Sequence, residues 1–263
     1  MNKLIFIIFL FSVIIVKSQK ISVVDSLDKS SISYSEILID GNRFFTDSLG
    51  NFNLSGAYKN IIIKKPGYYD KTLKKIENPV KLSPKVINIP EVHLTKRERK
   101  YISAKTKNNS TTVIPLGLEY GFKISNPYNK DGIIKSLMVP IKKIYENKAA
   151  ILVIKFYSIS NEVIENEPIE NSSIIININK LNKKENSIDF TDNFVMIPKE
   201  GLFISIQVIE EYGSDKIKID KPSISFINSV QKGKIYFLDV YERKWKLLSN
   251  NTALIGLSLI GDF

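Results

Sequence analysis

Apolar and polar residues alternate along much of the chain, which is the pattern of β-strands with one buried face. The segment from Leu202 to Val208 shows this clearly, because every second residue is apolar and would face the same way. The run from Ala150 to Phe156 is almost continuously apolar, as expected of a central strand that is buried on both faces. Hardly any segment follows the 3.6-residue period of a helix. The pattern therefore predicts an all-β protein.

The expected strands fall into two groups, separated by a polar stretch. The strands are predicted at residues 21–25, 35–39, 42–46, 51–54, 60–65, 87–89 and 92–94, and then at 120–124, 132–139, 150–156, 174–178, 202–208, 223–227, 235–241 and 254–260. Between the groups, residues 96–111 contain a charged run and an Asn/Ser-rich run. We interpret residues 96–111 as a linker between a domain at 19–95 and a domain at 112–263.

The first group is organised around the turn from Thr46 to Phe52. Asp47 can accept hydrogen bonds from the backbone N–H groups that follow it, and Gly50 can adopt positive φ without steric cost. The chain is therefore expected to reverse here and to join two antiparallel strands. A further hairpin is predicted at Asp40-Gly41, a dipeptide that favours tight hairpin turns.

The order of these segments resembles the carboxypeptidase-regulatory-like domain. The resemblance covers residues 20–95 and rests on Val23-Val24-Asp25, the turn Thr46-Asp47-Ser48-Leu49-Gly50-Asn51-Phe52, Gly67-Tyr68 and the apolar residues between Ile87 and Leu94. It implies a small, seven-stranded, transthyretin-like sandwich of the kind found in exported Bacteroidota proteins. The family's domain is not itself a peptidase, so the resemblance implies no catalytic residue.

For residues 112–263, the number of short strands favours a larger jelly-roll-like β-sandwich. Their order also resembles, loosely, the β-sandwich modules of Bacteroidota surface proteins. The expected fold class is therefore all-β, with a small transthyretin-like sandwich followed by a larger jelly-roll-like sandwich.

At the N-terminus, Lys3 precedes an apolar run from Leu4 to Val16, which predicts a secretory signal peptide at residues 1–18. The run is shorter than the roughly 20 residues that a membrane-spanning helix needs. We therefore expect an exported protein that is periplasmic, outer-membrane-associated or extracellular and has no transmembrane segment in its mature chain. The chain has no cysteine, so neither disulfides nor a lipidated N-terminal cysteine are expected.

The formal net charge of the chain is +11, and loss of Lys3 and Lys17 with the signal peptide leaves 11 − 2 = +9. The lysines lie in short pairs spread along the chain, without a basic stripe interleaved with aromatic residues. We interpret them as solvated surface charges and predict no nucleic-acid partner.

No constellation of catalytic groups stands out. The single histidine, His93, lies in an alternating run and is interpreted as an ordinary strand residue. The acidic groups at Glu165-Asn166-Glu167 and Glu210-Glu211 lack the spacing of a calcium loop. We therefore predict no metal, no cofactor and no catalytic residue. A pair of carboxylates for glycoside hydrolysis would have to come from scattered acids, namely Glu119, Asp189, Glu210 and Asp239.

Aromatic residues at predicted turns and strand ends offer a second kind of site, since their rings can stack on a sugar or on a partner's side chain. These residues are Tyr68, Tyr69, Tyr128, Tyr241 and Trp245. Sandwich cores use the same residues for packing, and we favour packing here.

Together these features predict a non-enzymatic binding or assembly module of the bacterial envelope, with an envelope protein or a cell-surface glycan as its partner. The alternative is a carbohydrate-active protein, either a lectin-like binder or a carboxylate-dependent hydrolase. The sequence leaves the oligomeric state open.

Overall fold

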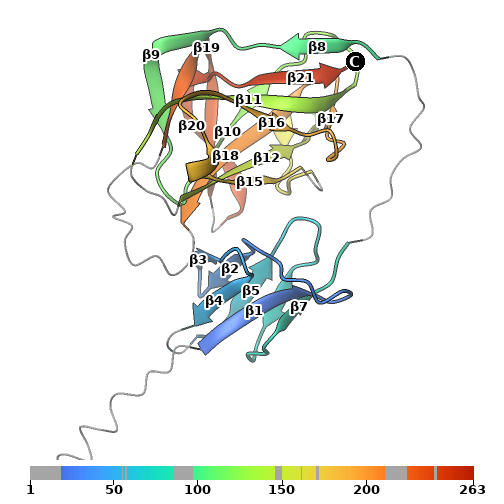
Figure 1. Ribbon diagram of the computed structural model, residues 1–263, viewed down its shortest axis with the longest axis vertical. Coiled ribbons are helices and arrows are strands. Elements are labelled where there is room, and N and C mark those ends of the chain that lie inside the picture. The colour runs from blue at the N-terminus through green and yellow to red at the C-terminus, as the bar shows by residue number, and fades with distance from the viewer. Residues whose placement is uncertain are drawn as a thin grey trace, which may run out of the picture. The chain divides into compact units, whose positions relative to one another are not determined.

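The computed structural model describes residues 19–54, 56, 58–85, 97–145, 150–160, 162–169, 172–210, 224–239 and 242–263, with only the backbone described at 108 and 210. The described chain is built almost entirely of β-strands, as predicted, and divides into two compact units (Figure 1). The first unit is formed by residues before 86 and the second by residues from 97 onwards. The predicted signal peptide and the predicted strands at 87–89 and 92–94 lie outside the described residues.

The first unit contains seven short strands in two antiparallel or mixed sheets. They are β1 (Gln19–Asp25), β2 (Glu36–Ile39), β3 (Asn42–Phe45), β4 (Asn51–Leu54), β5 (Ile61–Lys64), β6 (Lys71–Leu73) and β7 (Val80–Leu82). One sheet has the order β4-β1-β7 and the other has the order β3-β2-β5-β6. Alternating residues of these strands, including Ile21, Phe52 and Ile63, form one apolar core. The unit is a small sandwich, as the alternation predicted.

The turn at Thr46 to Phe52 has the predicted chemistry but a different topological role. Asp47 Oδ1 accepts hydrogen bonds from the N–H groups of Leu49 (2.9 Å) and Asn51 (2.7 Å), and Gly50 has φ +73°. However, β3 pairs with β2 and β4 pairs with β1, so the turn joins two sheets rather than two paired strands. The buried Thr46 extends the β2–β3 pairing up to the point of crossing: its N–H donates to the Ser35 carbonyl oxygen (3.0 Å), and its hydroxyl accepts a hydrogen bond from the Ser35 N–H. The hairpin at Asp40-Gly41 is present between β2 and β3.

The second unit contains the remaining strands and one short 3₁₀ turn. They are β8 (Arg99–Ile102), β9 (Thr106–Val113), β10 (Glu119–Ile124), β11 (Gly132–Ile144), β12 (Ala150–Tyr157), β13 (Ile159–Ser160), β14 (Val163–Ile164), β15 (Ile174–Asn177), η1 (Ile178–Lys180), β16 (Lys184–Asp189), β17 (Met196–Ile197), β18 (Leu202–Glu210), β19 (Ile224–Asp239), β20 (Lys244–Ile255) and β21 (Ser258–Asp262). Apart from the β13–β14 hairpin, these strands belong to one 12-stranded sheet.

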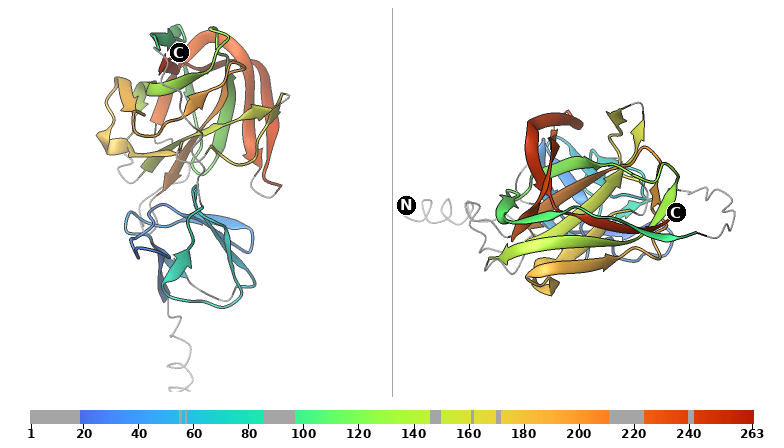
Figure 2. Two further views of the ribbon diagram at one scale, coloured as in Figure 1. Left: turned by 90° about the vertical axis from the view of Figure 1, so that its right-hand side faces the viewer. Right: turned by 90° about the horizontal axis from the view of Figure 1, so that it is seen from above.

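This sheet folds over on itself to enclose the main core (Figures 1 and 2). One layer has the order β15-β12-β18-β10-β19, and the other contains β8, β21, β11 and the partners β16 and β17. The end of β11 connects the layers by pairing with β19 at Ile141 and Phe226. Apolar side chains from both layers, among them Leu137 and Ile204, meet in the core. The predicted larger all-β sandwich is thus confirmed.

The interpretation of residues 96–111 as a linker is wrong for the part that the structure describes. Residues 99–102 form β8, which pairs with β21, and residues 106–113 form β9, which pairs with β19. Both strands are polar because much of their surface faces solvent, and their positions depend on backbone hydrogen bonds to strands more than 100 residues further along the chain. The pattern of apolar residues along the chain therefore does not predict which strands β8 and β9 pair with.

Three strand predictions near the C-terminus also need correction. The predicted strands at 223–227 and 235–241 are parts of the single strand β19, and the predicted strand at 254–260 covers the end of β20 and the start of β21. β19 and β20 form a long, strongly bent hairpin (Figure 2). Register shifts between Asn228 and Tyr236 accompany this bend, as expected of β-bulges.

Candidate functional site

A cleft of about 970 Å³ opens in the second unit at a place where its sheet splits. On one edge, β19 pairs with β9 as far as Ser229 and with β10 from Tyr236 onwards. On its other edge β19 pairs with β11 up to Phe226 and then with β20 from Asn228 to Asp239, with register shifts; Asn228 opposes both Lys107 of β9 and Ile255 of β20. Residues 231–235 therefore have one edge that pairs with no strand of the described chain.

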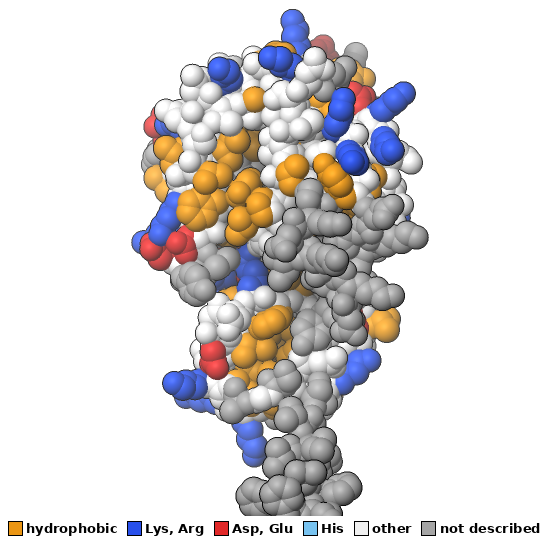
Figure 3. All heavy atoms as spheres, turned by 90° about the vertical axis from the view of Figure 1, so that its left-hand side faces the viewer, with side chains coloured by type: hydrophobic (Ala, Val, Ile, Leu, Met, Phe, Trp, Pro, Cys, Tyr) orange, Lys and Arg blue, Asp and Glu red, His pale blue; other side chains and the backbone are white. Residues whose placement is uncertain are grey.

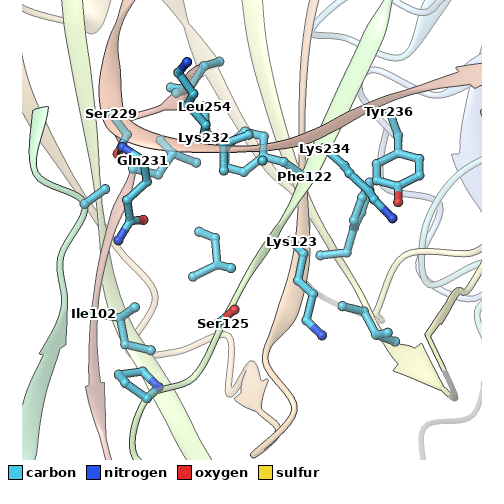
Figure 4. Close-up of a pocket in the computed structure, with 18 of the residues that line it drawn as sticks. Ile102, Phe122, Lys123, Ser125, Ser229, Gln231, Lys232, Lys234, Tyr236 and Leu254 are labelled. Carbon is cyan, nitrogen blue, oxygen red and sulfur yellow. Dashed lines mark hydrogen bonds between the residues drawn. The ribbon is translucent and has the colours of Figure 1, made fainter. Parts of the chain in front are cut away.

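The edge of β10 that faces this gap is open as well. Tyr120 and Gly121 pair with β18 on one side and with β19 on the other. Beyond them, Phe122 to Ile124 continue to pair with β18, while β19 bends away towards β20. In Figure 4 the residues of β19 from Ser229 to Tyr236 arch over the cavity, and Lys123 of β10 and Ser125, which follows the end of β10, lie across from them. The cleft is thus bounded by two strand edges.

The cleft lining combines lysines with hydroxyl, amide and aromatic groups. Lys123 comes from β10, and Lys232 and Lys234 come from β19; all three are exposed. Tyr101, Tyr236, Ser125 and Gln231 add hydrogen-bonding groups, and apolar residues such as Phe122 and Leu257 form the floor. Lys234 and Tyr236 lie together at one end of the cavity, and Ser229 and Gln231 lie at the other (Figure 4).

The lysines give the cleft a positive charge that the described chain does not neutralise. Glu162 is the acidic residue among those lining the cleft, so the formal charge of the lining is 3 − 1 = +2. None of the three lysines forms an ion pair with another described residue, whereas Lys155 and Lys246, in the same unit, both contact carboxylates. Uncompensated positive charge in a concave surface attracts anionic ligands.

Next to the cleft, the outer face of the layer around β10 buries a complete polar network. Glu119 is 1% exposed, and its carboxylate accepts hydrogen bonds from Lys155 Nζ (2.9 Å), Tyr157 Oη (2.7 Å) and Ser205 Oγ (2.6 Å). Burial raises the pKa of Glu119, but the Lys155 charge and these hydrogen bonds lower it by more, so its pKa lies below the usual range. Glu119 is therefore an ionised structural anchor, out of reach of a ligand.

An aromatic cluster packs beside this network. The ring centroid of Phe203 lies 4.6 Å from that of Trp245 and 5.7 Å from that of Tyr236, and Trp245 also packs edge-on against Tyr157. Phe203 and Tyr236 line the cleft, so these contacts fix one of its walls. Trp245, the chain's one tryptophan, consequently reports on this wall.

The four acids that the sequence offered as a hydrolytic pair are not brought together. Asp189 lies in β16, in the layer built on β11, and its pKa is lowered by hydrogen bonds from Thr191. Glu119 and Asp239 lie on adjacent strands but project to opposite faces, because Tyr120 is the residue that opposes Phe237. Asp239 contacts Lys246 at 2.8 Å. The side chain of Glu210 lies outside the described part of the chain.

The aromatic candidates are likewise dispersed. Tyr68, in the first unit, donates a hydrogen bond to Asp25 (2.9 Å), and burial together with this carboxylate raises the pKa of Tyr68 to about 12. Tyr69 is exposed, and Tyr128 packs against Phe263 and donates to the Tyr101 carbonyl (2.6 Å). These two tyrosines belong to different units. His93 and Tyr241 lie outside the described residues.

The cleft residues were missed at the sequence level. Lys232 and Lys234 alternate with Gly233 and Ile235, a signal that is visible in the sequence but is common on any strand surface. Lys123 lies more than 100 residues earlier, and only the divergence of β10 from β19 brings it to the same cavity.

The described residues contain neither a membrane-spanning helix nor a metal-binding group of side chains. No helix among them is long and apolar enough to cross a membrane. In the same residues, no three or more His, Asp or Glu side chains form a group suited to a metal ion. Hydrophobic side chains are visible on the face shown in Figure 3, beside scattered lysines and arginines.

Comparison with known proteins yields only distant similarities. No family model matches the chain, and no curated protein sequence matches it. Among solved structures, the chain is similar to the clostridial cysteine protease Cwp84 after propeptide cleavage (10% identity, TM-score 0.42, covering 62% of this chain and 40% of that one). It is also similar to the cysteine protease and lectin-like domains of Cwp84 from Clostridium difficile (11% identity, TM-score 0.41, covering 84% and 48%). The chain thus spans less than half of these proteins' length, and similarities this distant carry no inference about function.

Proposed function

We propose that this protein is a non-enzymatic binding module of the bacterial envelope and that it holds an anionic ligand in the cleft between β10 and β19. The observation that carries the proposal is the set of three exposed lysines, Lys123, Lys232 and Lys234, which converge on one cavity without carboxylate partners in the described chain. Tyrosine, serine and glutamine side chains around them supply the directional hydrogen bonds that a specific ligand needs.

Binding is favoured over hydrolysis by the chemistry of the lining. A carboxylate-dependent glycoside hydrolase needs two carboxyl groups facing one cavity. Glu162 is the single acid among the residues that line this cleft, and Glu119 is buried and ionised in its own network. The location in the envelope rests on the predicted signal peptide at residues 1–18 and on the resemblance of the first unit to domains of exported proteins.

The proposal can be tested by titrating the purified protein with polyglutamate, polygalacturonate and neutral dextran while following Trp245 fluorescence. We expect both polyanions to bind, dextran not to bind, and affinity to fall between about 0.1 M and about 1 M salt as charges become screened. Lys123→Glu/Lys232→Glu/Lys234→Glu should weaken polyanion binding by about tenfold or more.

The matched control changes the same amount of charge elsewhere in the second unit. Lys180, Lys183 and Lys184 are exposed and do not line the cleft, so their triple replacement by Glu should leave affinity nearly unchanged. Equal loss in both triple variants would mean that net charge, and not the cleft, attracts polyanions. Tight binding of dextran that ignores the cleft substitutions would contradict the proposal.

A further inference from the structure

The two strand edges that bound the cleft have the geometry of a sheet from which one strand is missing. Antiparallel strands 119–124 and 224–239 are paired only at Tyr120 with Phe237 and at Gly121 with Tyr236. From that point they separate, and both still pair on their far sides, β10 with β18 and β19 with β20. Every second backbone N–H and C=O of each strand points towards the gap.

The open edge of β19 is long enough for a short strand. Five extended residues advance by up to about 17 Å at 3.3–3.4 Å per residue, and a guest strand would lie about 4.8 Å from each neighbour. The cavity volume of about 970 Å³ is shared between these two edges, the residues around Tyr101 to Ala104, and the β13–β14 hairpin. No strand of the described chain fills the gap, although all residues that form its two edges are described.

The lysines beside the gap favour a guest peptide with acidic side chains. Lys123, Lys232 and Lys234 lie on the two strands that would flank the guest, at spacings of two residues within β19. Side chains of an added strand project alternately to the two faces, so every second guest residue lies beside these lysines. Carboxylates at those positions would neutralise the +2 charge of the lining.

Resting on the proposed function, we infer that the anionic ligand is an extended acidic peptide that adds as a strand between β10 and β19. Main-chain hydrogen bonds to the two open edges supply affinity, and Glu or Asp at alternate positions supplies specificity. The hydroxyl and amide groups of Tyr101, Ser125 and Gln231 lie at the rim, where they can receive polar side chains of the guest.

The test compares three probes on the intact protein by Trp245 fluorescence. The first is a peptide of about eight residues alternating Glu with Thr or Val, the second is the same peptide N-methylated at alternate residues, and the third is polygalacturonate, which is acidic but has no peptide backbone. We expect the first peptide to bind at least about tenfold more tightly than the N-methylated one, because N-methylation removes several strand hydrogen bonds.

Hydrogen exchange then locates the guest. Amides within Phe122–Ser125 and Gln231–Ile235 should gain protection with the first peptide and not with polygalacturonate. The triple lysine variant should lose binding of the first peptide, and the Lys180/Lys183/Lys184 control should retain it.

The outcomes separate this inference from the proposed function. Equal binding of all three probes, with loss in the triple lysine variant, would overturn strand addition while leaving an anion-binding cleft. Failure of all three probes to bind would overturn both. Tight peptide binding that protects neither open edge would place the peptide elsewhere and contradict the inference alone.

Discussion

Replacing Lys155 by Met tests whether the buried charge of Glu119 depends on its cationic partner. The ammonium lies 2.9 Å from Glu119 Oε2, and the Lys155 side chain is itself only 17% exposed. Removal of one member of a buried ion pair costs about 3–5 kcal/mol, because the remaining charge is left without compensation. Tyr157 and Ser205 still donate to Oε1, so we expect a loss near the lower end, about 3 kcal/mol.

The pH dependence of stability should change sign in this variant. In the natural protein the pKa of Glu119 is lowered on folding, so its contribution is present above the unfolded pKa and is lost as pH falls through the folded pKa. Without Lys155, the charge that lowers the pKa of Glu119 most is lost, so we expect burial to outweigh the two remaining hydrogen bonds and to raise the folded pKa above the unfolded one. Stability of Lys155→Met should therefore increase as pH falls from 7 towards about 5.

Urea denaturation followed by Trp245 fluorescence measures both effects in the second unit, since Trp245 is the chain's one tryptophan and its ring lies 5.2 Å from that of Tyr157. Lys123→Met is the matched control, because Lys123 projects from the same face of the sheet but is exposed; it should change stability by less than about 0.5 kcal/mol. A loss below about 1 kcal/mol for Lys155→Met, or an unchanged pH slope, would refute the reasoning.

Three further predictions concern the fold. Gly50→Val should destabilise the first unit by about 2–4 kcal/mol in chemical denaturation followed by far-ultraviolet circular dichroism, because φ is +73° and an added Cβ would lie 2.8 Å from the Val23 carbonyl oxygen; an unchanged midpoint would contradict this. Thr46→Val should cost about 1–3 kcal/mol in the same assay, since it leaves the buried Ser35 N–H unpaired, whereas Thr46→Ser should cost less. Limited trypsin digestion with mass spectrometry should cut slowly after Arg99 and Lys100, which lie in β8; rapid cleavage there would restore the linker interpretation.

Local turn chemistry and apolar alternation were readable from the sequence. The hydrogen-bonding role of Asp47, the positive φ of Gly50 and the strands with a buried face all follow from short-range preferences. What the sequence did not reveal is which strand each one pairs with. The turn after Thr46 carries the chain from the sheet of β2 and β3 to the sheet of β1 and β4, and no period in the sequence encodes that change of partner.

The polar strands β8 and β9 show the same limit. Their side chains are largely exposed, so no apolar period marks them, and their backbones are held by partners near Ser229 and Leu259. The cleft depends on these pairings in turn. It exists because β9 leaves β19 after Ser229 and β10 joins it only at Tyr236, and the interpretation of residues 96–111 as a linker contains no such interval.

A single strand, β10, links the buried network to the cleft. One face of β10 carries Glu119, Gly121 and Lys123. Glu119 is buried and its charge is compensated, whereas Lys123 is exposed and forms no ion pair with another described residue. Gly121 makes this arrangement possible, because a Cβ there would lie 2.3 Å from the Phe203 ring that closes the cleft wall. The Glu119 carboxylate accepts hydrogen bonds from Lys155, Tyr157 and Ser205 and forms no ion pair with Lys123. Under the proposed function, the lysines of the cleft are available to a ligand, and the buried network beside them positions the edge of β10 that the ligand would contact.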